Sequence, residues 1–303
     1  MTPQPPAGGG EPLLDAAALR QLESLSLAAV EAIVSGFGGQ RAGAGRSRGL
    51  EFVDYRRYTP GDDLRSIDWN VYARLREVVV KASPSEGHVG LALLLDGSRS
   101  MQSGEPSKFR YAQQLGAMLG TVALLGSDLV AVHLLADGDS WTAARLTAPH
   151  LVTELVEEMA TLPRGRRTDL TASLRAYRRQ SPDADLAVLL TDAFAEPADL
   201  ESAVAELAGG AHAAALVHVV DPGEAATELR GPVELRDSES GELLVVDVTP
   251  AVRRSYGERL AREAGRLREL CGANGVAYVR APTELAPLDL LFDAARGAEL
   301  VSA

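Results

Sequence analysis

The sequence predicts an α/β fold, in which a doubly wound and mostly parallel sheet is covered by helices on both faces. After residue 88, short apolar runs alternate with helical stretches, which is the order typical of such domains. The runs are continuous in Leu, Val and Ala, as in strands that are buried on both faces. With 303 residues, of which 46% are hydrophobic, the chain can bury one large core and still carry smaller additions.

The order of elements follows from these runs. Strands are expected at residues 88–96, 128–136, 184–192, 213–221 and 275–281. Helices are expected at about 107–125, 151–160, 170–180, 198–208, 252–271 and 284–296. The pattern breaks at about residues 222–250, where PVELRDSESGELLVVDV has a Ser-Gly turn between two strand-like runs. This segment is expected to be an inserted hairpin.

The first 87 residues have a different character. Residues 1–14 are rich in Pro and Gly and are expected to form a disordered tail. Apolar residues at helical spacing up to about Ser35 predict an amphipathic helix. A strand, a turn at Pro60-Gly61, a short helix and a second strand are expected to follow. We therefore expect residues 15–87 to form a helix and a small polar subdomain, and residues 88–303 to form the main domain.

Composition limits the function and the location of the protein. The net charge of −12 would repel polyphosphate, which argues against binding to nucleic acid. The one cysteine, Cys271, excludes an internal disulfide and any metal site built from several cysteines. No apolar run reaches the roughly 18 to 20 residues that span a bilayer, and the N-terminus lacks the pattern of a signal peptide. A cytoplasmic protein is expected, and peripheral association with a membrane stays open.

Charged and aromatic side chains are interleaved within the small polar subdomain. This arrangement has two readings, an ion-pair network that holds a turn or a docking surface for a partner, and both stay open. The residues concerned are Arg57, Tyr58, Asp62, Asp63, Arg65, Asp68, Trp69 and Arg74.

Oxygen-bearing side chains follow two of the predicted strands. Asp96, Ser98 and Ser100 lie at and just past the end of the first strand, and Asp192 ends the third. Thr168 precedes a predicted helix, next to Asp169, which could instead cap that helix. Ligand sites of open α/β sheets lie beyond the carboxyl ends of the strands, where the strand order reverses. Hydroxyl and carboxylate oxygens in this number suit a hard divalent ion such as Mg²⁺, with Mn²⁺ or Ca²⁺ as alternatives.

Two resemblances follow from these residues. The pattern Asp96-x-Ser98-x-Ser100, then Thr168, then Asp192 is similar to the metal-ion-dependent adhesion site (MIDAS) of von Willebrand factor A domains. The upstream run, from Arg57-Tyr58 through Gly61-Asp62-Asp63 and Ile67-Asp68-Trp69 to Ala73-Arg74, resembles the signature of the bacterial family called domain of unknown function 58. The first resemblance implies a von Willebrand A-like fold and a metal role for those five residues. The second implies a working link to MoxR-type AAA+ ATPases.

The resemblances imply a protein-interaction module that is not an enzyme. Such a module would act as a chaperone-like adaptor in protein assembly or maturation, and its ion would grip an acidic residue of the ATPase or of a client protein. The alternative is a metal-dependent hydrolase, similar to a phosphatase, that uses the same ion to activate water. A third reading makes the polar subdomain and the hairpin the partner surface, with the main domain as a scaffold.

Other catalytic patterns are not found in the sequence. The five histidines include no His-Glu-x-x-His pair, and His133 and His218 lie within apolar runs, as core histidines do. The Ser hydrolase motif Gly-x-Ser-x-Gly does not occur around Ser98. Asp137-Gly-Asp139 lacks the later ligands of a calcium loop and is expected to be a turn.

Overall fold

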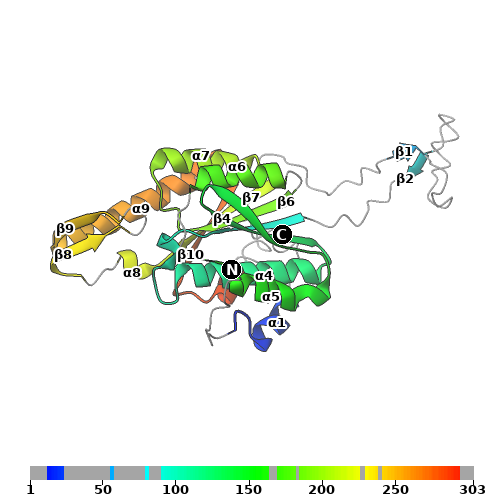
Figure 1. Cartoon of the computed structure of the whole chain (residues 1–303), viewed down its shortest axis with the longest axis horizontal. Helices are drawn as coiled ribbons and strands as arrows, with labels where there is room; N and C mark the ends of the chain where they lie inside the picture. The colour runs from blue at the N-terminus through cyan, green and yellow to red at the C-terminus, as the bar shows by residue number, and fades with distance from the viewer. Residues whose placement is uncertain are drawn as a thin grey trace, which may run out of the picture. The chain divides into compact units, whose positions relative to one another are not determined.

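A computed structural model of the chain describes residues 12–23, 55–57, 79–81, 90–163, 169–181, 184–225, 229–237 and 241–293 (Figure 1). The chain divides into two compact units, residues 43–88 and the rest. Helix α1 (Ala16–Leu22), expected to form part of residues 15–87, belongs to the larger unit. The reason is that Leu13, Leu14 and Leu22 are buried in the core of that unit.

The larger unit is built on one six-stranded sheet. All five strands expected from the apolar runs are present and parallel to one another, which confirms the predicted mostly parallel α/β fold. The strand order is β10-β7-β6-β3-β4-β5. The parallel strands are β3 (Gly90–Asp96), β4 (Leu129–Ala136), β6 (Ala184–Thr191), β7 (Ala211–Val220) and β10 (Val276–Pro282).

The sixth strand, β5 (Asp139–Leu146), was not expected from the sequence. It pairs antiparallel with β4 across a two-residue turn, Asp137-Gly138, in which both residues have positive φ. An Asp-Gly pair with this backbone is the type I′ turn that joins hairpin strands. The expected turn is confirmed, and its function is to add an edge strand to the sheet.

Helices cover both faces of the sheet, as the sequence predicted (Figure 1). One face carries α4 (Lys108–Leu125) and α5 (Val152–Thr161). The other face carries α6 (Leu170–Gln180), α7 (Pro197–Ala208) and α9 (Pro250–Ala273). Strand β3 shows the consequence, because Leu91, Leu93 and Leu95 join one apolar cluster while Ala92 and Leu94 join the other. Residues 287–293 form the helix expected at the end of the chain.

The inserted hairpin is confirmed. Strands β8 (Gly231–Arg236) and β9 (Leu243–Val248) pair antiparallel in a sheet of their own, after a short helix, α8 (Pro222–Ala225). In the smaller unit, β1 (Tyr55–Arg57) pairs antiparallel with β2 (Val79–Lys81), where strands were expected. The turn and the short helix expected between them lie outside the described residues. Within the described residues, no helix combines the length and the apolar character that crossing a bilayer requires.

Candidate functional site

The candidate site lies where the strand order of the sheet reverses. After β3 the chain first adds β4 on one side and later adds β6 on the other, so the reversal falls between β3 and β6. Asp96 ends β3, and Thr191 and Asp192 lie at the end of β6. This is the position at which open α/β sheets bind their ligands. The geometry therefore brings the ends of two distant segments to one edge.

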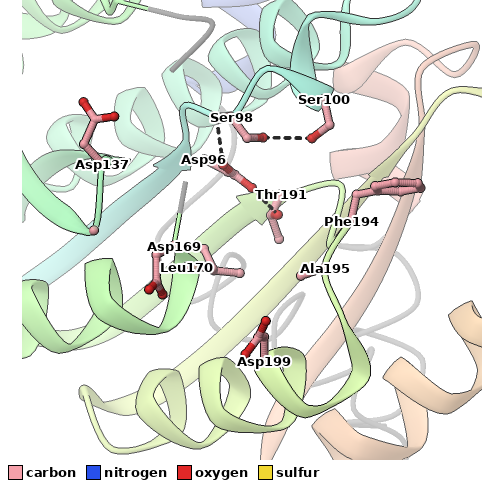
Figure 2. A pocket seen from close by; sticks show the side chains of 11 residues that line it. Asp96, Ser98, Ser100, Asp137, Asp169, Leu170, Thr191, Phe194, Ala195 and Asp199 are labelled. Atoms are coloured by element: carbon pink, nitrogen blue, oxygen red, sulfur yellow. Dashed lines mark hydrogen bonds between the residues drawn. The ribbon is translucent and has the colours of Figure 1, made fainter. Parts of the chain in front are cut away.

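The loop after β3 points its polar groups into this edge. The Ser98 N–H donates to Asp96 Oδ1 at 2.9 Å, and the Ser98 and Ser100 hydroxyl oxygens lie 2.9 Å apart (Figure 2). Gly97 allows the loop to lie close to β4, because a Cβ there would meet Leu134 Cδ1 at 3.0 Å and Leu135 O at 3.2 Å. A short 3₁₀ helix, Ser100–Gln102, then turns the chain away.

Asp96 is held by both of its oxygens. The Thr191 hydroxyl donates to Asp96 Oδ2 at 2.6 Å and itself accepts the Ala193 N–H at 2.9 Å. Burial and the neighbouring negative charge of Asp192 raise the pKa of Asp96 to about 6. The hydrogen bonds from Thr191 and Ser98 act in the opposite direction and offset this only in part. The Asp96 carboxylate is thus held in a fixed direction, and a positive charge beside it would stabilise its ionised form.

Asp192 lies beside Asp96 but is turned toward a lysine. Its Oδ2 accepts from Lys108 Nζ at 2.7 Å, and its Oδ1 accepts the Phe194 N–H at 3.2 Å. The Lys108 ammonium also pairs with Glu224, and its side chain is only 1% exposed. Burial acts to lower the pKa of Lys108, but the two carboxylates outweigh burial, and the pKa is raised. Lys108 therefore carries its charge at neutral pH.

Around Asp96 the surface forms an open pocket of about 570 Å³. Three further carboxylates stand at its edge, and that of Asp199 points toward it from α7 (Figure 2). Phe194 is 68% exposed there. The lining residues are Asp96, Ser98, Ser100, Asp137, Gly138, Asp169, Leu170, Thr191, Phe194, Ala195 and Asp199.

The structure brings together part of the set that the sequence suggested. Asp96, Ser98 and Ser100 line the pocket, and Asp192 lies next to Asp96. Asp169 lines the pocket and also caps α6, since its Oδ1 accepts the Ala172 N–H at 2.9 Å. Thr168 lies outside the described residues. Of the suggested partner surface, Arg57 is described as backbone in β1, and the others lie outside the described residues: Tyr58, Asp62, Asp63, Arg65, Asp68, Trp69 and Arg74.

The donors present fit a hard divalent ion. Among the residues that the structure describes, no group of three or more His, Cys, Asp or Glu side chains is placed to hold a metal. The donors closest to one another in the pocket are the carboxylate of Asp96 and the hydroxyls of Ser98 and Ser100. Neighbouring ligands of an octahedral ion at about 2.0–2.1 Å lie about 2.9 Å apart. The Ser98 and Ser100 oxygens have that separation, which also suits a hydrogen bond between them.

His133 is a core residue, as expected, and His218 is partly buried. His133 and His218 lie in β4 and β7, and burial lowers the pKa of each to about 4. The His218 Nδ1 lies 2.7 Å from the Tyr278 hydroxyl. Neither residue lines the pocket. Cys271 is buried in the core of the face that carries α9.

Three residues of the site had not been singled out in the sequence, namely Thr191, Lys108 and Glu224. Thr191 had a signal, because it is a polar residue directly before Asp192 at the end of an apolar run. Lys108 had a weaker one, since it is one of only two lysines among 30 basic residues. Glu224 had none, because its link to Lys108 spans 116 positions of sequence.

Comparison with known proteins identifies the family. Residues 54–266 match the family model described as "Protein of unknown function DUF58". The uncharacterized protein Rv1480 of Mycobacterium tuberculosis is similar, with 28% identity over 267 residues, which cover 85% of this chain and 82% of that protein. The uncharacterized protein Mb1516 of Mycobacterium bovis matches with the same identity and coverage.

Two solved structures also share features with the chain. One is the conserved hypothetical protein BatB from Bacteroides thetaiotaomicron, with 19% identity and a TM-score of 0.41, covering 70% of this chain and 99% of that one. The other is described as von Willebrand factor type A from Catenulispora acidiphila, with 16% identity and a TM-score of 0.38. That match covers 73% of this chain and 43% of the other. The family model spans well over half of the sequence, and the chain belongs to the DUF58 family.

Proposed function

We propose that this protein is a metal-dependent protein-interaction module. Asp96, Ser98 and Ser100 would hold a divalent ion, Mg²⁺ or else Mn²⁺ or Ca²⁺, with Thr168 as a further ligand and Asp192 acting through water. The observation that carries the proposal is the pair of hydroxyls 2.9 Å apart beside a buried, fixed carboxylate, at the point where the strand order reverses. The ion would supply positive charge and a coordination position open to the pocket.

The donor set favours binding over hydrolysis. Hydroxyls are neutral ligands, so among the proposed direct ligands only the carboxylate of Asp96 offsets part of the charge of the ion. An acidic side chain of a partner can then complete the shell. The proposal assigns no catalytic residue, and binding is the whole of the proposed activity.

The proposed partner is a MoxR-type AAA+ ATPase, or the acidic residue of a client protein that the ATPase acts on. The support is the resemblance of the upstream signature to the family of domain of unknown function 58, to which the chain belongs. The module would serve protein assembly or maturation in the bacterial cytoplasm, where ATP is available to the ATPase.

The test is the binding of the purified ATPase to this protein, measured by isothermal titration in Mg²⁺ and in EDTA. Binding is expected in Mg²⁺ and not in EDTA, and it should be lost in Asp96→Asn, because that variant removes the fixed carboxylate. Asp199→Asn is the matched control, since Asp199 lines the same pocket and loses the same charge. Equal binding with Mg²⁺ and with EDTA, or by Asp96→Asn and wild type, would contradict the proposal.

A further inference from the structure

A buried chain of charges runs from the pocket into the protein. Asp192 neighbours Asp96, Lys108 Nζ lies 2.7 Å from Asp192 Oδ2, and the same ammonium pairs with Glu224 on α8. The Asp192 and Lys108 side chains are 4% and 1% exposed. Ser103 Oγ lies 2.9 Å from Glu224 Oε1 and 2.9 Å from Ser100 O, so the far end of the chain returns to the loop of the site.

Lys108 occupies a position at which a cation destabilises its own helix. Lys108 is the first residue of α4, where the positive end of the helix dipole disfavours a cation. Lysine is also among the residues least often fully buried, because removing its charge from water is costly. A lysine in this position therefore points to a role in the site that the carboxylates share.

The charges define what the site can attract. Within this chain of charges, Asp96, Asp192 and Glu224 bring three negative charges and Lys108 brings one positive charge, so two negative charges remain. The carboxylates of Asp137, Asp169 and Asp199 line the pocket and are not part of the chain. A divalent ion would bring this chain of charges to neutrality. Without Lys108 the group would hold three negative charges, would bind the ion more strongly and would still be negative when loaded. Coulomb interactions between such groups are strong, because burial removes the water that would screen them.

We propose, on the basis of the proposed function, that Lys108 sets the charge balance of the ion site. It weakens the binding of the divalent ion, and in doing so it keeps the loaded site receptive to a carboxylate from a partner. Asp192 contributes to this role, because its Oδ2 accepts from Lys108 Nζ, which turns that oxygen toward the ammonium. Lys108 is a positioning residue in this scheme and touches neither ion nor partner.

The test measures two affinities for each of four proteins. Mn²⁺ affinity is measured by isothermal titration, and acetate, the smallest model of a partner carboxylate, is titrated into the Mn²⁺-loaded protein and followed by the relaxation of water protons. The proteins are wild type, Lys108→Met, Lys108→Arg and Glu224→Gln. Circular dichroism and thermal melting establish that each is folded.

The two neutralising variants are expected to behave in opposite ways. Lys108→Met should bind Mn²⁺ about tenfold more tightly or more, and acetate correspondingly less tightly. Glu224→Gln removes a negative charge from the same ion pair and should weaken Mn²⁺ binding and strengthen acetate binding. The change in Mn²⁺ affinity should be smaller for Glu224→Gln than for Lys108→Met, because Glu224 is 29% exposed and solvent screens its charge. Lys108→Arg keeps the charge and should stay close to wild type in both.

The outcomes separate this inference from the proposed function. If Lys108→Met and Glu224→Gln shift the Mn²⁺ affinity in the same direction, Lys108 has only a structural role and the inference is overturned, while the ion site stands. If the wild type binds no Mn²⁺, the proposed function fails first and the inference fails with it. If Lys108→Met does not fold, Glu224→Gln decides, because tighter Mn²⁺ binding by that variant would overturn the inference.

Discussion

At the scale of single residues, the site differs from the rest of the core in how its buried charges are treated. His133, buried in β4, meets only neutral partners at hydrogen-bond distance: Nδ1 lies 3.3 Å from the Ser140 and Thr142 hydroxyls, and Nε2 lies 3.5 Å from the Ser181 hydroxyl. Asp96 and Lys108, by contrast, are buried next to other charges. Within the described residues, the buried Asp, Glu, Lys and Arg side chains are Asp96, Lys108, Asp128 and Asp192, and all of these except Asp128 belong to the site.

The lowered pKa of His133 predicts how the free energy of unfolding depends on pH. Burial, helped by the charge of Arg145, lowers its pKa to about 4, below the usual value near 6.5. Between these two values the unfolded chain binds a proton that the folded protein does not. The contribution of His133 to the free energy of unfolding is therefore present above pH 6.5 and is lost as the pH falls toward 4, by up to about 3 kcal/mol.

The measurement is urea unfolding of wild type and His133→Gln between pH 7.5 and 4.5. The free energy of unfolding should fall less steeply with decreasing pH in the variant. Other titrating groups, His218 among them, are common to both proteins and cancel in the difference. Parallel curves for the two proteins would show that His133 is not the buried neutral histidine described.

At the scale of the elements, the helices differ in how closely they pack against their neighbours. In α4, a Cβ on Gly120 would come within 2.7 Å of Leu155 Cδ2 and within 3.3 Å of both Leu93 and Val130 side chains. In α9, a Cβ on Gly265 would meet nothing within 4 Å. Helix α4 is thus packed closely between α5 and the sheet, whereas this part of α9 faces open space.

These two glycines give a matched pair of substitutions. Gly120→Ala should lower the free energy of unfolding by about 1–3 kcal/mol, because overpacking of a buried contact outweighs the gain in helix propensity. Gly265→Ala should raise it by about 0.5–1 kcal/mol, since only the propensity changes. Chemical denaturation of both variants tests this, and a stabilised Gly120→Ala protein would show that the contact of α4 with α5 is looser than described.

The edge strand β5 shows what a pattern of residues leaves undetermined. Its side chains alternate between exposed and buried positions only in part, so its run DSWTAARL lacks the continuous apolar character that revealed the parallel strands. The Asp137-Gly138 turn was a usable signal, because that pair between two extended segments is typical of a hairpin. The parallel strands were predictable because helices cover both of their faces, which requires apolar residues at every position.

At the scale of the whole molecule, the sequence predicted the fold well and the site in part. The spacing of Asp96, Ser98 and Ser100 indicated a site because all three lie in one short loop after a buried strand. The placement of Asp192 on Lys108 could not be predicted, because it joins the end of β6 to the start of α4 across 84 positions. A local sequence pattern does not predict which of several carboxylates will pair with a buried cation, since that depends on how the elements pack in three dimensions.

The central claim is that the pocket binds one divalent ion through Asp96 and the two serines. The most direct measurement is isothermal titration of metal-stripped protein with Mg²⁺ and Mn²⁺, in parallel with the Asp96→Ala variant. The account predicts binding of one ion per chain in the wild type and its loss in a folded Asp96→Ala protein. No binding by the folded wild type, or equal affinity in the variant, would contradict it.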